Sequence, residues 1–267
     1  MKLALLGGGR MGKALLGGLL DGGWDAGSLS VAEVDPEGRR ELELRFGGVR
    51  VVPSAAWAVA DCDVVVVAVK PGDVVDVLAH SGDQLPESAL VLSIAAGVTI
   101  DAIEAVVPGR PVVRAMPNTP ALIRQGAAAI AGGTHATEAD LDVGERILGS
   151  VGVVVRVPEA LLDAVTGLSG SGPAYVFLVA EALIEAGVFV GLPRDTTVTL
   201  VEQTLVGAAT MLAEGDESPE SLRAAVTSPG GTTAAGLTKL ETLGVRAAMI
   251  EAVAAATNRS GELGRGE

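Results

Sequence analysis

The first residues of the chain place a short apolar strand directly before a Gly-x-Gly-x-x-Gly sequence. Lys2–Leu6 is the strand, Gly7, Gly9 and Gly12 form the repeat, and a helical pattern covers Met11–Leu20. In this context Gly7 permits a tight turn, Gly9 lets the backbone approach an anion, and Gly12 allows close helix–strand packing. Unpaired N–H groups at the helix start then attract a pyrophosphate. The sequence therefore predicts a dinucleotide site, and a glycine-rich turn without a ligand is the alternative.

Strand and helix patterns alternate through residues 1–157. The expected strands are Lys2–Leu6, Leu29–Val34, Val49–Val52, Asp63–Val69, Leu90–Ile94 and Val112–Ala115, with weaker signals at Ala127–Ile130 and Val151–Val157. Asp63–Val69 contains a continuous valine run, which is typical of a strand buried on both faces. Repeated strand–helix units predict an α/β fold: a doubly wound, Rossmann-like parallel sheet over residues 1–157 with helices on both faces.

From residue 158 onward all patterns are helical. The expected helices are Glu159–Val165, Pro173–Val190, Arg194–Ala213, Pro219–Ala225, Thr232–Leu243 and Val245–Arg259, with a break across 169–172 and frayed residues at 261–267. The helix from Pro173 is apolar nearly all round, with Glu181 and Glu185 as its main charges, so we expect it to be buried. The mean hydropathy of +0.46 also exceeds what a lone globule of this size hides comfortably. An all-helical dimerisation domain over 158–267, in a homodimer or an oligomer of dimers, follows as the prediction.

Charge and composition exclude several kinds of partner. The net charge of -14 argues against nucleic acid, whose binding proteins present basic faces. No signal-peptide pattern and no run of about 18 uncharged apolar residues is present, so we expect a cytoplasmic protein without a membrane span. The single cysteine, Cys62, is expected to be a small residue at a strand entry. His80 and His135 are expected at the surface, and no Cys/His cluster marks a metal site.

Two acidic residues follow the second expected strand at the distance that dinucleotide-binding proteins use. Glu33 lies about 20 residues after the glycines, and Asp35 comes two residues later. A carboxylate there accepts hydrogen bonds from the adenosine ribose and repels a 2′-phosphate, which favours NADH. Arg39 and Arg40 lie one turn further on, where they could reach a phosphate. The alternative is that the two acids only cap the next helix.

Further candidate residues follow three other strands, at the sheet edge where open α/β sheets bind ligands. Lys70 ends the most buried strand, and a solvated lysine is the alternative. Small residues across 93–98 leave room for a ring to lie against the backbone. Asn118 follows the strand after that, where it either hydrogen-bonds the nicotinamide amide or makes an Asx turn before Pro120.

A second glycine-hydroxyl loop, Thr227–Thr233, precedes a helical pattern near the end of the chain. Such a loop can hold a small carboxylate through backbone N–H groups and hydroxyls. Reduction of a protonated cyclic imine creates no alkoxide that a histidine must protonate, so positioning and a carboxylate clamp suffice. An ordinary helix–helix turn is the alternative.

Six blocks of sequence, taken in order, resemble the signature blocks of pyrroline-5-carboxylate reductases. They are Gly-Gly-Gly-Arg-Met-Gly, Val-Ala-Val-Lys-Pro, Ser-Ile-Ala-Ala-Gly-Val, Arg-Ala-Met-Pro-Asn-Thr-Pro, Ser-Gly-Ser-Gly-Pro-Ala-Tyr and Thr-Ser-Pro-Gly-Gly-Thr-Thr, within residues 2–263. The resemblance implies reduction of 1-pyrroline-5-carboxylate to L-proline by NADH or NADPH. It implies an active site between the cofactor domain of one subunit and the helical domain of its partner. Thr233 would hydrogen-bond the ring nitrogen. Val34 and Asp35 stand where NADPH-preferring members often carry Ser, Thr or Arg, which puts a preference for NADPH in doubt.

The predicted site therefore has three parts. Cofactor binding is assigned to Gly7, Gly8, Gly9, Arg10, Met11, Gly12, Glu33, Asp35, Ala68, Val69, Lys70, Pro71, Ala95, Ala96, Gly97 and Asn118. Substrate binding is assigned to Ser228, Pro229, Gly230, Gly231, Thr232 and Thr233, and the candidate catalytic residues are Thr233 and Lys70. The alternatives are a general imine reductase, a hydroxyacid dehydrogenase and a non-catalytic dinucleotide sensor. Pro173–Val190 lacks the lysine or histidine acid that a hydroxyacid dehydrogenase usually places there, and a sensor has no need of the second loop.

Overall fold

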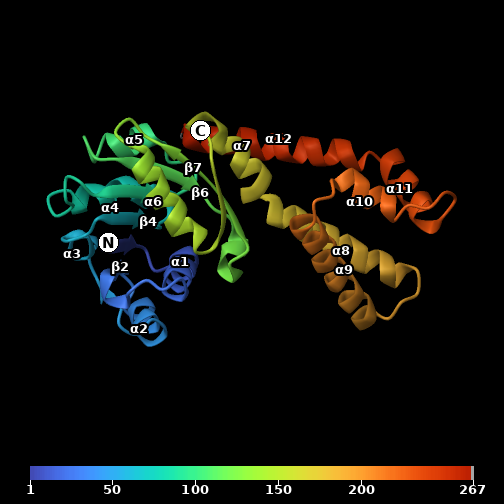
Figure 1. The fold of residues 1–267 in the computed structure, drawn as a ribbon, viewed down its shortest axis with the longest axis horizontal. Helices are drawn as coiled ribbons and strands as arrows, with labels where there is room; N and C mark the ends of the chain where they lie inside the picture. Colours follow the sequence, from blue (N-terminus) through green and yellow to red (C-terminus); the bar gives the residue numbers. More distant parts are fainter. Residues whose placement is uncertain (266–267) are drawn as a thin grey trace. The chain divides into compact units, whose positions relative to one another are not determined.

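The computed structural model describes residues 1–265, which form two compact units (Figure 1). The first unit combines Met1–Ser171 with the end of the chain from Ala254 onward, and the second unit is Gly172–Val253. The first unit contains the sheet and the helices that cover it, whereas the second consists of helices.

The first unit is built on an eight-stranded sheet with the order β3-β2-β1-β4-β5-β6-β7-β8. The strands are β1 (Leu3–Leu6), β2 (Leu29–Ala32), β3 (Arg50–Val52), β4 (Val64–Val67), β5 (Leu90–Ser93), β6 (Val112–Met116), β7 (Gly126–Gly132) and β8 (Gly152–Arg156). Neighbours are parallel except for β6 and β7, which are antiparallel. In register, Leu6 on β1 pairs with Ala32 on β2 and with Val67 on β4. The strand order thus reverses at β1, which places the glycine loop at the switch point where such sheets bind ligands.

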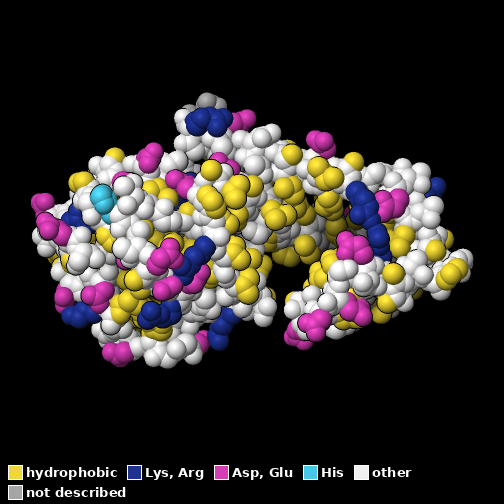
Figure 2. Space-filling model, turned by 45° about the horizontal axis from the view of Figure 1, so that its top comes forward, with side chains coloured by type: hydrophobic (Ala, Val, Ile, Leu, Met, Phe, Trp, Pro, Cys, Tyr) yellow, Lys and Arg dark blue, Asp and Glu magenta, His cyan; other side chains and the backbone are white. Residues whose placement is uncertain are grey.

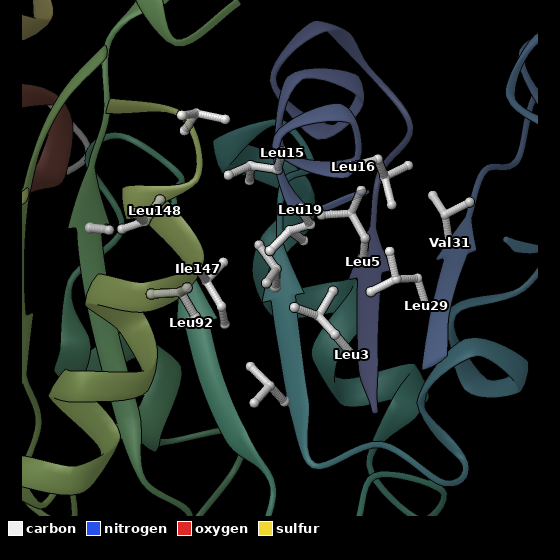
Figure 3. Close-up of a cluster of buried hydrophobic side chains, with 14 of the residues drawn as sticks. Leu3, Leu5, Leu15, Leu16, Leu19, Leu29, Val31, Leu92, Ile147 and Leu148 are labelled. Atoms are coloured by element: carbon white, nitrogen blue, oxygen red, sulfur yellow. The ribbon is translucent and has the colours of Figure 1, made fainter. Parts of the chain in front are cut away.

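Helices cover both faces of this sheet, as the sequence predicts. They are α1 (Arg10–Asp21), α2 (Pro36–Arg45), α3 (Ala55–Val59), α4 (Val74–Ser81), α5 (Ile100–Glu104), α6 (Glu138–Gly149) and α7 (Leu162–Val165), with short turns η1 (Ala26–Ser28), η2 (Pro71–Asp73), η3 (Thr119–Ile123) and η4 (Glu159–Leu161). Alternate strand residues face opposite cores. Leu3 and Leu5 pack with Leu15, Leu19 and Ile147 on one face (Figure 3). The other core contains Ala4, Leu6, Val65 and Val67, packed with helices α3, α4 and α5.

The chain leaves the sheet through a π-helical turn, η5 (Thr166–Gly170), where the sequence predicts a break at 169–172. The backbone N–H of Ser171 donates to the carbonyl of Thr166 at 2.8 Å, five residues back, so the helical path widens instead of ending. Ser171 is a bend between η5 and α8, so the elements change inside the predicted break. The expected fraying of 261–264 is wrong. Helix α12 (Val245–Gly264) continues through these residues, and the hydroxyl of Ser260 donates to Asp163 on α7 at 2.7 Å. Residues 266–267 lie outside the described part of the chain.

The second unit is made of α8 (Gly172–Phe189), α9 (Arg194–Glu214), α10 (Pro219–Ala225), α11 (Thr232–Thr242) and the first part of α12. Large apolar side chains stand exposed on these helices, among them Phe177, Leu178 and Phe189. Figure 2 shows apolar atoms gathered along the helical part of the chain. By length and composition alone, the stretch Glu159–Phe189 would suffice to cross a membrane. The structure divides it into η4, α7, η5 and α8, and surface of this kind is also what a subunit interface leaves bare in one copy.

Candidate functional site

The glycine loop after β1 has the geometry of an anion-binding turn. Gly7 has a φ of +106°, and a Cβ there would lie 2.7 Å from the carbonyl oxygen of Ala68. The N–H of Gly7 donates to the carbonyl of Ala32 at 3.0 Å, which holds the loop against the end of β2. A Cβ on Gly12 would overlap the carbonyl of Gly7. Both glycines are therefore needed for the backbone path itself.

The start of α1 is left open for a ligand. Gly9 is the N-cap, it makes no side-chain cap, and no acidic residue lies in the first turn, which begins with Arg10 and Met11. A Cβ on Gly9 would meet nothing within 4 Å. The first N–H groups of a helix have no partner within the helix, so this end presents donors and the positive end of the helix dipole to open space. These residues fit a pyrophosphate.

The two predicted acids after β2 have different roles: Glu33 holds the glycine loop, and Asp35 caps the next helix. The carboxylate of Glu33 accepts the N–H of Gly8 at 3.0 Å and the N–H of Asp35 at 2.9 Å. Asp35 is the N-cap of α2 and accepts the N–H of Gly38 at 2.8 Å, so the capping alternative describes Asp35. Arg39 donates to the carbonyls of Glu33 and Val34 at 2.9 and 2.8 Å. Each carboxylate oxygen has more than one lone pair, so Glu33 can still accept from a ribose hydroxyl.

A cleft of about 740 Å3 opens beside this loop. Its lining includes predicted residues Gly7, Gly9, Glu33, Ala68, Val69 and Lys70. Lys70 is exposed and precedes the turn η2, at the crest of the sheet where the sequence places it. Pro53, Ser54 and His80 also line the cleft, and the sequence analysis did not assign them to it. The sequence gives little indication that these residues line a cleft, because β3 is only 3 residues long and His80 lies on the exposed side of α4.

The loop after β5 borders a second cleft of the first unit, of about 720 Å3. Pro71, Ala96 and Gly97, three predicted cofactor residues, line it together with Thr99 and the end of α12. Ala95 lies buried at the start of the loop. The loop offers only small side chains at its centre, so a flat ring can approach its backbone.

Asn118 uses both ends of its amide inside the fold. Its Nδ2 donates to the carbonyl of Ser169 at 3.0 Å, and its Oδ1 accepts the N–H of Ala127 at 2.9 Å. It makes no side-chain cap at the turn η3, so the Asx-turn alternative is wrong. A role toward nicotinamide stays a prediction, and the second N–H of the amide and the second lone pair of Oδ1 are left for it.

The second glycine loop belongs to the other unit and has a helix start of the same open kind. Gly231 is the N-cap of α11 and makes no side-chain cap. A Cβ on Gly231 would lie 2.5 Å from the hydroxyl oxygen of Ser228, and the N–H of Gly231 donates to the carbonyl of Ser228 at 3.0 Å. Thr232 and Thr233 follow in the first turn and are exposed, as are Ser228, Pro229 and Gly230. Because Gly231 occupies the cap position, Thr233 is not the N-cap of this helix.

Two charged residues that the sequence analysis did not assign lie next to the β5 loop. Arg114 is buried in β6, and its Nη1 donates to Oε1 of Glu159 at 2.9 Å. The same oxygen accepts the N–H of Ile100, the first residue of α5, at 2.7 Å. Arg114 stands inside one of the quoted sequence blocks, but nothing in that block indicates a partner 45 residues away. Within residues 1–265, no group of three or more His, Cys, Asp or Glu side chains is placed to hold a metal ion.

Comparisons with known proteins match both parts of the chain. Residues 2–97 match the family model described as NADP oxidoreductase, coenzyme F420-dependent, and residues 159–263 match the model described as pyrroline-5-carboxylate reductase dimerisation. A pyrroline-5-carboxylate reductase from Synechocystis is 44% identical over 269 residues, which cover 99% of each chain. A solved pyrroline-5-carboxylate reductase from Coxiella burnetii is 37% identical with a TM-score of 0.94 and 98% of each chain covered. That from Plasmodium falciparum, with NADP bound, is 32% identical with a TM-score of 0.86, covering 99% of this chain and 98% of that one.

These similarities extend over nearly the whole chain, so they include the glycine loop, the sheet edge and the second loop together. The fold and the order of the sequence blocks agree with them. The chain therefore belongs to the pyrroline-5-carboxylate reductase family.

Proposed function

We propose that this protein reduces 1-pyrroline-5-carboxylate to L-proline by hydride transfer from NADH or NADPH, the last step of proline biosynthesis. The observation that carries the proposal is the pair of open helix starts, one after β1 and one before α11, in a chain that is 44% identical to a pyrroline-5-carboxylate reductase along its full length. One start suits a dinucleotide pyrophosphate, and the other suits a small carboxylate.

The dinucleotide is bound by the backbone at the switch point of the sheet. The N–H groups of the first turn of α1 hold the pyrophosphate, and Gly9 leaves the space that it needs. The first cleft takes the adenosine half beside Glu33, and Lys70 lines this cleft directly before Pro71, which lines the second cleft. The loop Ala95–Gly97 supports the nicotinamide ring, and the bound dinucleotide supplies the hydride. A protein with a net charge of -14 can hold an anion in this way because the donors are backbone groups.

The end of β2 supports a preference for NADH over NADPH. Glu33 and Asp35 place two carboxylates where a 2′-phosphate would lie. Arg39, one of the two arginines that could offset them, donates to two backbone carbonyls. These bonds hold the guanidinium of Arg39 against the backbone through Nη1, and we expect repulsion by the two carboxylates to dominate.

The substrate is held by the second loop. The N–H groups of Gly230 and Thr232 and the hydroxyl of Ser228 bind the carboxylate, and Thr233 hydrogen-bonds the ring nitrogen, while the N–H of Gly231 holds the loop through Ser228. Protonation of the imine makes its carbon the acceptor of the hydride, so these residues act by positioning. Lys70 is the candidate for a charged group near the reacting atoms.

Self-association completes the site. The family model for dimerisation matches residues 159–263. Large apolar side chains in this segment, such as Leu178, which is 63% exposed, are available for burial against a second subunit. We assign dinucleotide binding to residues 1–157 and substrate binding with dimerisation to 158–267. The active site is then shared between the cofactor domain of one subunit and the helical domain of its partner, in a homodimer or a larger assembly of dimers. The protein works in the cytoplasm, without nucleic acid or membrane partners.

The test follows the absorbance of NADH in the presence and absence of 1-pyrroline-5-carboxylate. We expect consumption only with the pyrroline acid, together with formation of L-proline. Turnover of a 2-oxoacid instead would identify a hydroxyacid dehydrogenase, and turnover of uncharged cyclic imines would identify a general imine reductase. Binding of NADH without turnover of any of these substrates would identify a dinucleotide sensor.

A further inference from the structure

We infer that Glu159 is a positioning residue for hydride transfer: it fixes the loop after β5 on which the nicotinamide ring rests. The inference rests on the proposed function, because it concerns the placement of that ring. Its basis is one carboxylate oxygen, Oε1 of Glu159, which accepts the N–H of Ile100 at 2.7 Å and Nη1 of Arg114 at 2.9 Å.

The loop between β5 and α5 is short and is anchored at both ends. At its start the N–H of Ile94 donates to the carbonyl of Val67 at 3.1 Å, and the N–H of Ala95 donates to the buried hydroxyl of Ser93 at 3.4 Å. Between the anchors, Gly97 adopts a φ of +75°. The first anchor comes from the sheet itself, so the β5 end of the loop moves only if the sheet moves.

The second anchor comes from a distant part of the chain. The N–H of Ile100 opens α5, which is only 5 residues long, and Thr99 caps it through a 3.3 Å bond from the N–H of Ala102. A helix of this length contributes little rigidity of its own. Beside the burial of Ile100 and Ile103 in the core, the carboxylate of Glu159, in the turn η4, supplies a hydrogen bond that ties the backbone at the far end of the loop to the rest of the unit.

Arg114 in turn orients Glu159. The Arg114 side chain is 8% exposed in β6, and its guanidinium meets Oε1 of Glu159 in a charge-assisted hydrogen bond. A buried guanidinium is costly without a partner, so the pair holds the carboxylate in one position over the start of α5. Strand β6, helix α5 and the turn η4 thus meet at a single oxygen atom.

The two halves of the dinucleotide are therefore held by different parts of the unit, and only the nicotinamide half depends on Glu159. The adenosine half lies in the first cleft, whose lining residues make no contact with Glu159 among the hydrogen bonds of residues 1–265. The nicotinamide half lies on Ala95–Gly97, one turn before Ile100. Loss of the anchor therefore misplaces the hydride donor while leaving most of the dinucleotide affinity intact.

Two double variants separate the effect of the hydrogen bond to Ile100 from the effect of the buried ion pair. Arg114→Met with Glu159→Gln removes both charges and keeps an acceptor oxygen for Ile100, whereas Arg114→Met with Glu159→Leu removes both charges and the acceptor. Apolar replacement of a whole buried ion pair is often tolerated, so both proteins should fold. The matched control is Glu104→Ala, because Glu104 at the other end of α5 accepts the N–H of Thr134 at 2.6 Å, away from the loop.

Three measurements are made on each protein: kcat with 1-pyrroline-5-carboxylate, the Kd of ADP-ribose, and amide exchange across 96–103. We expect the Leu-containing variant to lose about tenfold or more in kcat, because small displacements of reacting groups cost large factors in rate. Its Kd for ADP-ribose should stay within about twofold of wild type, since that ligand tests only the adenosine half. Exchange at Ile100 should accelerate. The Gln-containing variant and Glu104→Ala should retain most of the wild-type kcat.

Wild-type kcat in the folded Leu-containing variant would overturn the inference. So would equal losses in the Gln- and Leu-containing variants, because the acceptor would then be irrelevant. A parallel loss of ADP-ribose binding would show general damage to the domain and would also overturn it. If the Leu-containing variant does not fold, the single variant Glu159→Gln is measured instead. A tenfold lower kcat with unchanged amide exchange at Ile100 would then overturn the inference, because the anchor would still be in place. A wild-type protein that fails to reduce the pyrroline acid would reject the proposed function instead.

Discussion

The carboxylate of Glu33 accepts the backbone N–H of Gly8 at 3.0 Å, so the acid that follows β2 is joined directly to the glycine loop that follows β1. In the proposed function the residue combines two tasks, support of the loop and a negative charge beside the ribose. The variant Glu33→Gln separates them, because glutamine keeps the size and one acceptor oxygen but loses the charge. We expect the ratio of kcat/KM for NADH to that for NADPH to fall about three- to fivefold, in line with an exposed charge interaction of about 1 kcal/mol or less.

The control for that experiment is Glu37→Gln, which removes an acidic residue from the first turn of α2 without touching the loop. Its cofactor ratio should match wild type. An equal loss with both cofactors in Glu33→Gln, at an unchanged ratio, would mean that Glu33 acts only through Gly8.

Gly9→Ala should weaken cofactor binding without weakening the fold. A Cβ at Gly9 meets no protein atom within 4 Å, so the melting temperature should change little. The same Cβ occupies the approach of the pyrophosphate, so the Kd for NADH should rise about tenfold or more, the equivalent of roughly 1.4 kcal/mol. The matched variant is Gly17→Ala inside α1, where the Cβ makes an ordinary 3.8 Å contact with Phe46. It should bind NADH normally and gain up to about 1 kcal/mol in helix stability. Unchanged NADH affinity in Gly9→Ala would place the pyrophosphate elsewhere.

Thr233→Ala should lower kcat/KM for 1-pyrroline-5-carboxylate by roughly tenfold or more, because a hydrogen bond to a charged group is worth about 1.5–3 kcal/mol. The Kd for NADH should barely change, and Thr233→Ser should retain most activity. Thr238→Ala is the control, since its hydroxyl donates to the carbonyl of Ala234 at 2.8 Å within the same helix. Normal turnover together with a lower melting temperature in Thr233→Ala would assign the residue to stability alone.

Leu178→Glu should shift the assembly towards monomer. Leu178 is 63% exposed on α8, and in a dimer a glutamate there would be an unpaired charge in the interface. Glu181→Gln on the same helix is the comparison, because it adds no charge. Light scattering at micromolar concentration gives the mass, and turnover measured on the same samples shows whether activity follows assembly. A wild-type protein that is monomeric and fully active would contradict the proposed dimer with its shared active site.

Cys62 should resist alkylation in the folded protein. Burial, with a smaller contribution from Asp63, raises the pKa of its thiol from 9.0 to about 11. At pH 8 the thiolate fraction is then about a hundredfold lower than in the unfolded chain, so reaction with iodoacetamide should be slower by at least that factor. Because the folded pKa is the higher one, the stabilising contribution is complete below pH 9 and is lost as the pH rises from about 9 to about 11. Cys62→Ala should lack this part of the pH dependence, and rapid labelling at pH 8 would contradict the burial.

Local patterns predicted the elements of this chain closely. Helix α10 begins and ends at the predicted residues, Pro219 and Ala225, because Ser218 caps it and a proline opens it. The valine run of β4 is buried on both faces, as a continuous apolar strand requires. The glycine loop lies at the switch point for the same reason: its spacing encodes backbone geometry that only glycine allows. These features depend on residues that are neighbours in the sequence.

The hydrogen bonds that support the candidate site could not be predicted from local sequence patterns. The pairing of Arg114 with Glu159 and the bonds from Asn118 to Ser169 and Ala127 connect residues that no periodicity relates. The antiparallel direction of β7 and the continuation of α12 past Ser260 likewise depend on what these segments pack against. Donors and acceptors of this kind choose their partners by position in space.

The sequence by itself determined the two-part architecture and the two glycine loops that are the candidate anion sites, because turn geometry and hydrophobic periodicity are local properties of the chain. The order of six sequence blocks indicated the family. The tertiary structure alone decided which side chains support the candidate site. Glu33 supports the glycine loop, and Glu159 with Arg114 supports the loop after β5. Hydrogen bonds act over about 3 Å, and only folding brings residues from distant parts of the chain to that distance.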